Sequence, residues 1–163
     1  MQPFIRVSQL KQSFGAQEVL KGVSFDVDKG ELLALIGGSG AGKSVILKHL
    51  DGLIDPLDGY VDIDGRRISN VPEKVKREIR SKIGFMFQQG ALFDSLSVGE
   101  NVAFPLQEAG LKNEEELDSR ISAALESVGL SGQEEKMPAN LSGGMIKRVA
   151  VARAIVMTPE LSL

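Results

Sequence analysis

The chain has 163 residues, of which 42% are hydrophobic and 25% charged, and its net charge is −3 at pH 7. This composition is typical of one soluble globular domain, and the charge argues against a nucleic-acid-binding surface. The sequence contains no cysteine, which excludes disulfides and thiolate metal sites and favours a reducing compartment. The N-terminus lacks a signal-peptide pattern, and the longest apolar run, residues 32–36, is too short to span a membrane. We expect a soluble chain that reaches a membrane only through a partner.

The first part of the chain predicts β structure that leads into a loop. Residues 23–28 alternate apolar and polar side chains, which is the period of a half-buried antiparallel strand. Residues 32–36 are continuously apolar, as expected of a parallel strand buried on both faces. A glycine-rich loop comes next, followed by a predicted helix over about 43–51 that ends near Gly52.

The middle of the chain predicts short elements. A β-hairpin is expected over 59–68, with Asp64-Gly65 as its turn pair. A helix is expected to begin near 70–73, and residues 83–87 form a second apolar strand pattern.

Residues 98–136 predict a helical stretch that no buried strand interrupts. Ser97 with Glu100 has the pattern of a capping box at a helix start, and Asn113 with Glu116 repeats it. The stretch resembles an insertion between α/β elements, so the order of elements predicts two lobes, with a nucleotide site on the α/β lobe.

The end of the chain predicts one more helix and the start of a strand. The helix is expected from residue 143 to about 157, with Ser142 as its N-cap and Thr158-Pro159 at its end. Residues 160–163 have the pattern of a strand.

A phosphate-binding loop is the clearest motif, because residues 37–44 match G-x-x-x-x-G-K-[ST] in full. Glycines let the backbone curl so that successive N–H groups face phosphate oxygens, and the following helix adds its positive N-terminal end. Lys43 would place its charge on the β- and γ-phosphates, and the Ser44 hydroxyl would bind Mg²⁺. The loop alone does not separate ATPases, GTPases and kinases. The predicted nucleotide-binding residues in it are Gly37, Gly38, Ser39, Gly40, Ala41, Gly42, Lys43 and Ser44.

Further motifs separate these three classes of nucleotide-binding protein. The segment Leu-Ser-Gly-Gly-Met at 141–145 resembles the LSGGQ signature of ATP-binding-cassette (ABC) ATPases, with Met145 in place of the usual glutamine. Residues 83–88 resemble the strand that leads into the family's Q-loop, and Phe14 falls where the family keeps an aromatic residue that stacks on adenine. The resemblance spans essentially the whole chain, with the phosphate loop and the signature in the family's order.

The resemblance implies an α/β P-loop NTPase fold. A RecA-like core with an N-terminal antiparallel β subdomain would take residues 1–90 and about 146–163, and an inserted α-helical signature subdomain would take about 91–145. The resemblance also implies ATP and Mg²⁺ as cofactors, a second cassette as a head-to-tail partner, and an integral membrane permease. That permease would hold the chain, a cytoplasmic protein, on the inner face of the cell membrane.

The family's functional residues can be placed on this sequence. Lys43 and Gln88 would act in catalysis, and Ser44 and Gln88 would bind Mg²⁺, with Gln88 also touching the attacking water. In the family each signature closes over the ATP held by the other cassette. The residues that would bind nucleotide in this way are Leu141, Ser142, Gly143 and Gly144. A plain capped helix start is the alternative explanation of this segment.

A resemblance to a narrower group of ABC ATPases indicates the cargo, meaning the transported solute. The chain resembles the ATPases of lipid-asymmetry and mammalian-cell-entry importers in three places. These are residues 89–96, residues 101–106, and the signature with the Lys147-Arg148-Val149 that follows it. This likeness implies transport of phospholipid or another hydrophobic solute.

Four other features have simple structural explanations. His49 lies six residues past Lys43 and is expected to be a packing or surface residue, because the family's switch histidine comes later in the sequence. Arg66-Arg67 is typical of a solvated hairpin end, and residues 114–116 of an acidic helix start. Phe14, as a strand aromatic, could also belong to the core.

The family pattern continues past residue 163 with the Walker B aspartate, its adjacent glutamate and the switch histidine, so the fold would be incomplete at the C-terminus. We therefore expect the 163 residues alone to be inactive in hydrolysis and marginally stable, with residues 32–36 presenting an unpaired strand edge and an uncovered apolar face. Three functions stay open: the ATPase subunit of a transporter, a non-hydrolysing nucleotide-binding module, and a non-transport ABC ATPase. The interval between Gln88 and Leu141 has room only for a transporter-type helical lobe, which weighs against the third.

Overall fold

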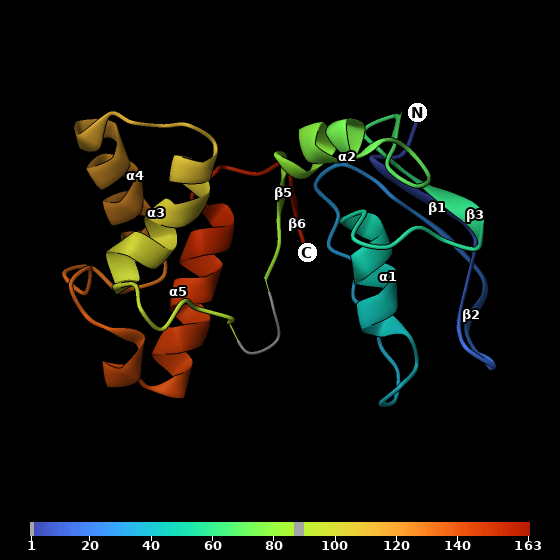
Figure 1. Ribbon diagram of the computed structural model, residues 1–163, viewed down its shortest axis with the longest axis horizontal. Helices are drawn as coiled ribbons and strands as arrows, with labels where there is room; N and C mark the ends of the chain where they lie inside the picture. The colour runs from blue at the N-terminus through green and yellow to red at the C-terminus, as the bar shows by residue number, and fades with distance from the viewer. Residues whose placement is uncertain (1, 87–89) are drawn as a thin grey trace. The chain divides into compact units, whose positions relative to one another are not determined.

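The computed structural model describes residues 2–86 and 90–163, and the chain divides into two units, Met1–Arg80 and Ser81–Leu163 (Figure 1). The first unit holds a four-stranded sheet with the order β2-β1-β3-β4. Its strands are β1 (Ile5–Phe14), β2 (Gln17–Val27), β3 (Asp58–Ile63) and β4 (Arg66–Arg67), and its helices are α1 (Lys43–Leu50) and α2 (Glu73–Arg80).

The sheet is antiparallel and its inner face supplies most of the first unit's core. β1 pairs with β2 on one side and with β3 on the other. Ile5 and Val7 of β1 turn inward, and an irregularity at Gln9 shifts the alternation so that Leu10 is the next buried residue. They are buried together with Leu20 and Val61 from the neighbouring strands. Each such side chain contributes about 1.5–3 kcal/mol when fully buried. The expected alternation over 23–28 is confirmed, since Val27 is buried and Asp26 is exposed.

The predicted hairpin at 59–68 is also confirmed. β3 and β4 pair antiparallel around Asp64 and Gly65, whose φ angles are 50° and 70°. Two successive positive φ values define the turn whose twist matches the strands on either side, and glycine is the residue that adopts such angles most easily.

The prediction of a buried strand over residues 32–36 was wrong. The segment has no strand structure, and Leu32 and Ile36 are each 95% exposed. A strand needs a hydrogen-bonded neighbour, and none of the described strands pairs with this run. The expectation of an uncovered apolar face at this segment is confirmed by the same exposure.

The second unit is built on three helices that contact one another: α3 (Val98–Glu108), α4 (Glu114–Ser127) and α5 (Gly143–Ile155). Their shared core includes the fully buried Val102, Leu106, Leu125 and Val149. Figure 1 shows the three helices gathered in this unit. A 3₁₀ turn, Pro138–Asn140, precedes α5, and β5 (Ile83–Gly84) pairs in parallel with β6 (Leu161–Ser162). The predicted strand over 83–87 therefore forms at its start, and Phe87 lies outside the described residues.

The predicted helix starts in this unit are confirmed. The Ser97 hydroxyl accepts from the Glu100 amide, and the Glu100 carboxylate accepts from the Ser97 amide, which completes the capping box. The Asn113 side chain accepts from the Glu116 amide at 3.0 Å, and the Ser142 hydroxyl from the Met145 amide at 3.3 Å. The predicted division into a core of 1–90 and 146–163 and a helical subdomain of 91–145 stays a prediction.

Among the helices of the described residues, none combines the length and apolar character needed to cross a lipid bilayer.

Candidate functional site

The glycine-rich loop curls tightly just before α1. Gly42 is the N-cap of α1 with a φ of 87°, and its carbonyl accepts from the amides of Val45 at 3.0 Å and Ile46 at 2.9 Å. Gly40 has a φ of 77°, and Ala41 donates back to the Gly38 carbonyl at 3.3 Å. These left-handed angles explain why glycine is required at two of the loop's positions.

The loop also lies very close to β2. A Cβ atom on Gly42 would come within 2.8 Å of Leu20 Cδ2 and 3.1 Å of Val19 Cγ1. Glycine is therefore required at position 42 for two reasons: the left-handed backbone angle, and the lack of space for a side chain against β2. The contact seats the loop on a strand of the sheet, which gives the loop a defined position in the first unit.

Lys43 closes the loop with its side chain. Its ammonium group donates to the carbonyls of Gly37 and Gly38, at 2.7 Å each. An ammonium carries three donors and an anionic oxygen is a better acceptor than a neutral carbonyl. The same group is thus held beside the loop in a position from which it can turn to a phosphate.

The loop and the start of α1 fit a magnesium–nucleotide complex. Residues 37–41 and Ser44 are exposed, and the first amides of α1 have no acceptor inside the helix. Among the described residues no cluster of His, Cys, Asp and Glu could hold a metal ion. At phosphate sites Mg²⁺ needs only one or two protein groups beside the phosphate oxygens, and the exposed Ser44 hydroxyl is a group of that kind.

Phe14 lies at the end of β1, beside the β1–β2 turn, and is 52% exposed. The alternative that it belongs to the core is therefore wrong, because its ring is not buried in the sheet. Stacking on adenine stays a prediction. Gln88, the other residue assigned to catalysis and to Mg²⁺, lies outside the described residues.

The signature segment forms the start of α5 in the second unit. Ser142, Gly143 and Gly144 are all exposed. A Cβ atom on Gly143 would meet nothing within 4 Å, and one on Gly144 would touch only the Ser142 hydroxyl at 4.0 Å. Within the part of the chain that the structure describes, no close packing therefore requires glycine at these two positions. Glycine also weakens a helix by about 1 kcal/mol relative to alanine, so helix stability does not explain them either. Their effect is to leave the helix start bare, with its amides accessible.

Leu141 and Met145 flank these exposed residues and are partly buried against the helical core. The departure from the family's glutamine at Met145 therefore concerns a side chain that packs inside the unit. It leaves the exposed serine and glycines unchanged.

His49 is a packing residue, as expected. It is 1% exposed, and its Nδ1 atom lies 3.0 Å from the Ile54 carbonyl oxygen. Burial lowers the pKa of the ring, which keeps it neutral. It is located on the inner side of α1 and has no contact with the phosphate loop among the interactions of the described residues.

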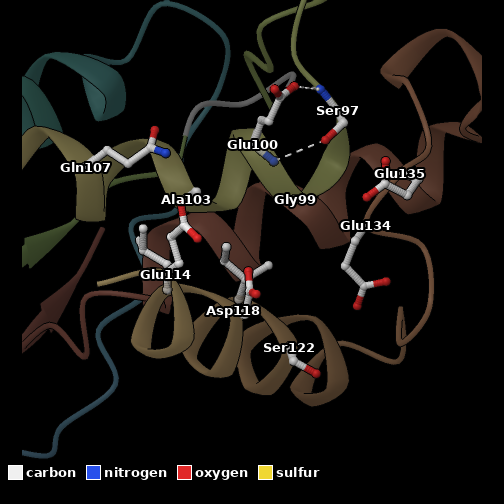
Figure 2. A pocket seen from close by; sticks show the side chains of 12 residues that line it. Ser97, Gly99, Glu100, Ala103, Gln107, Glu114, Asp118, Ser122, Glu134 and Glu135 are labelled. Carbon is white, nitrogen blue, oxygen red and sulfur yellow. Dashed lines mark hydrogen bonds between the residues drawn. The ribbon is translucent and has the colours of Figure 1, made fainter. Parts of the chain in front are cut away.

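A separate cavity of about 620 Å³ lies between α3, α4 and the loop that follows α4 (Figure 2). Its lining carries five carboxylates, on Glu100, Glu114, Asp118, Glu134 and Glu135, and includes no lysine or arginine among its residues, all of which are described. Glu100 serves the capping box with Ser97, and Glu134 accepts from the Gly132 amide. An acidic lining repels phosphate, so this cavity is not a nucleotide site.

Comparison with known proteins identifies the class. Residues 20–163 match the family described as ABC transporter. The chain belongs to this family of ATP-binding cassettes.

Three curated relatives are similar over nearly the whole chain. The chain is 44% identical over 159 residues to the probable ribonucleotide transport ATP-binding protein mkl of Mycobacterium leprae, covering 98% of this chain and 46% of that protein. It is 44% identical over 153 residues to the chloroplastic protein TRIGALACTOSYLDIACYLGLYCEROL 3 of Arabidopsis thaliana, covering 93% and 44%. It is 40% identical over 159 residues to the methionine import ATP-binding protein MetN of Rhizobium etli, covering 98% and 44%. The chain thus spans less than half the length of these relatives.

Solved structures confirm the predicted P-loop NTPase fold. The dimeric structure of MJ0796, a bacterial ABC transporter cassette, aligns with a TM-score of 0.88 at 32% identity and covers 95% of this chain and 70% of that one. A dimeric post-hydrolysis state of MJ0796 bound to ADP and Pi aligns with a TM-score of 0.86 at 32% identity, with the same coverage.

Proposed function

We propose that the chain is the nucleotide-binding part of a transporter's ATPase subunit, which binds MgATP at residues 37–44 and, in the full-length protein, hydrolyses it. The observation that carries this proposal is the loop itself: left-handed glycines, a close seat on β2 and a lysine ammonium held at 2.7 Å from two loop carbonyls. Turns of this kind aim their amides at an anion.

The role proposed for each residue of the site follows from the chemical groups that it carries. The loop amides and the start of α1 would bind the phosphates, and Lys43 would exchange its carbonyl acceptors for phosphate oxygens. Mg²⁺, when bound with ATP, neutralises charge that develops on the phosphates during transfer. Ser44 and Gln88 would orient that ion, Gln88 would also hold the attacking water, and Phe14 would stack on the adenine ring.

The exposed signature is proposed to bind the nucleotide of a second cassette. The bare helix start at Gly143 and Gly144 supports this role, since neither glycine is needed for packing inside the chain. The dimeric MJ0796 structures, similar in fold, support pairing of two cassettes. Leu141, half-buried, and the Ser142 cap would hold the helix start in shape while its amides face the partner's phosphates.

The cargo is proposed to be a phospholipid or another hydrophobic solute. The likeness of residues 89–96 and 101–106 to lipid importers supports this class, and one relative's name contains that of a glycolipid. Other relatives are named for ribonucleotide and methionine transport, so the proposed cargo rests on the sequence likeness of these two segments. The chain would act on the cytoplasmic face of a membrane through an integral permease.

The test of the nucleotide site uses the full-length protein. Lys43→Ala removes charge-assisted bonds worth about 1.5–3 kcal/mol each, so ATP affinity should fall by about 10- to 100-fold or more. Titration with a fluorescent ATP analogue measures this. Lys48→Ala is the matched control, because Lys48 lies on the same helix and is exposed. Equal affinities of the two variants would contradict the assignment, and binding without turnover would reduce the proposal to a nucleotide-binding module.

A further inference from the structure

Arg148 of α5 caps the C-terminal end of a neighbouring helix of the second unit, α4. The carbonyl groups at the end of a helix lack amide partners within it, and the last turn of α4 carries no basic residue of its own. The Arg148 Nη1 group donates to the carbonyls of Val128 and Gly129 at this end, at 3.2 Å each. A cation is favourable there, because the C-terminus of a helix carries a partial negative charge. α5 therefore supplies the positive charge that the end of α4 lacks.

The main chain at the end of α4 leaves room for this guanidinium. Gly129 follows the C-cap residue of α4 with a φ of 67°, and its amide donates back to the Glu126 carbonyl at 2.9 Å. A left-handed glycine at this position is a common way to end a helix. A Cβ atom on Gly129 would lie 3.4 Å from Arg148 Nη1, so a side chain there would crowd the guanidinium. The end of α4 and Arg148 therefore fit each other closely.

The first turn of α5 needs support from outside the helix. It contains Gly143 and Gly144, each of which weakens a helix by about 1 kcal/mol relative to alanine. The Ser142 hydroxyl caps this turn, and Met145 is partly buried against the helical core. Arg148 adds a contact about 9 Å along the helix axis from Ser142, at a rise of about 1.5 Å per residue. The signature thus lies between its own cap and the point where α5 is joined to α4.

We propose that Arg148 is a positioning residue for the signature: its bonds to the end of α4 fix the direction of the first two turns of α5, and with it the direction of the Gly143 and Gly144 amides. This inference rests on the proposed function, because it takes from it the binding of a second cassette's nucleotide by these amides. A helix start binds an anion through amides that already point together. A first turn that is free to tilt therefore binds less tightly, even where the helix stays folded.

The test is nucleotide-dependent pairing of the full-length protein, measured by fluorescence energy transfer between two labelled populations in ATPγS, a slowly hydrolysed ATP analogue. For Arg148→Ala we expect the dissociation constant of the pair to rise about tenfold or more, since small misplacements of groups have effects of that size. Nucleotide affinity, titrated at protein concentrations too low for pairing, should change less than about twofold, because the hydrogen bonds of Arg148 among the described residues go to the end of α4. Arg148→Lys should fall between the wild type and Arg148→Ala, since lysine keeps the charge but not the planar shape.

Arg153→Ala is the matched control. Arg153 lies further along α5 and also donates to two consecutive main-chain carbonyls, those of Gly90 at 2.6 Å and Ala91 at 2.9 Å. Because these bonds are shorter, Arg153→Ala should lower the melting temperature at least as much as Arg148→Ala does. Its pairing in ATPγS should stay within about twofold of the wild type. Equal losses of pairing in the two alanine variants, or unchanged pairing in Arg148→Ala, would overturn the proposal.

Mixed pairs locate the effect at the signature. When Arg148→Ala pairs with Lys43→Ala, the nucleotide held by the first chain meets the intact signature of the second, as it does when the wild type pairs with Lys43→Ala. The two mixed pairs should therefore have dissociation constants within about twofold of each other, although Arg148→Ala pairs weakly with itself. A tenfold deficit that persists in the mixed pair would refute the inference. Failure of the proposed function is recognised separately, because the wild type would then not pair in response to nucleotide, or Lys43→Ala would leave nucleotide binding intact.

Discussion

Asp51 shows how burial and charge conflict at a single residue. It caps α1, is 8% exposed, and burial raises its pKa to about 6, while the nearby Arg80 guanidinium lowers that pKa. The folded state therefore disfavours the ionised carboxylate. Stability is unaffected below the unfolded pKa of about 4, and is lost by up to about 3 kcal/mol as the pH rises through 6.

Asp51→Asn should relieve this conflict. Asparagine cannot ionise, so the variant is expected to be more stable than the wild type by up to about 3 kcal/mol at pH 7.5 and by only about 1 kcal/mol at pH 4.5, where the folded carboxyl is still mostly protonated. Urea denaturation of the full-length protein at both pH values measures the difference. His49 destabilises the fold at low pH because burial lowers its pKa, but this effect is common to both proteins and cancels. An equal gain at the two pH values would show that the carboxylate's ionisation is not the cause.

At the level of elements, the capping box of α3 is the best-defined helix start. Both reciprocal bonds between Ser97 and Glu100 are present, at 3.2 and 2.7 Å. The second unit depends on this helix, since Val102 and Leu106 of α3 are part of its core. Loss of the capping box would therefore also weaken the packing of α4 and α5 against α3.

Ser97→Ala should lower the free energy of unfolding by about 1 kcal/mol, the usual effect of losing an N-cap. Ser122→Ala gives the opposite control, because Ser122 is exposed in the middle of α4, where alanine is the better helix former. Thermal melts of the two variants should shift in opposite directions. A neutral Ser97→Ala variant would mean that the cap contributes nothing to stability.

Local patterns explain which elements were predictable from the sequence. The caps at Ser97, Asn113 and Ser142 need only residues within four positions of one another, and all three formed as expected. The tight curl of the loop at residues 37–44 was equally predictable, because its glycines adopt left-handed angles within a few residues of one another, and phosphate binding there stays a prediction. Residues 32–36 were not, since a strand depends on neighbours from elsewhere in the chain.

The contacts of Arg153 were outside the reach of sequence patterns for a similar reason. Its partners lie 62 and 63 residues away along the chain, and both are main-chain carbonyls that carry no side-chain pattern. Gly90, one of these two partners, has a left-handed φ and lies against Ile146, which is 56 positions further along the chain.

At the scale of the whole molecule, exposed apolar side chains predict how these 163 residues behave alone. Leu32 and Ile36 are 95% exposed and Leu57 is 68% exposed, which leaves apolar surface without cover in the first unit. We expect this polypeptide to melt below or near the lower end of the range usual for mesophilic domains, about 45 °C, and to bind a hydrophobic dye. Circular dichroism on heating measures the midpoint. A cooperative transition well above about 65 °C would contradict the expectation.

The exposed apolar run at residues 32–36 also matters during synthesis, because the chain is made from its N-terminus. The antiparallel sheet needs nothing beyond Arg67, so it can close as soon as the first unit has left the ribosome. Leu32, Leu33 and Ile36 meanwhile have no strand partner among the described residues. A short apolar run in that state pairs readily with the same run on a neighbouring nascent chain. We therefore expect the segment that leads into residues 37–44 to be the first part of the nascent chain that needs protection from association.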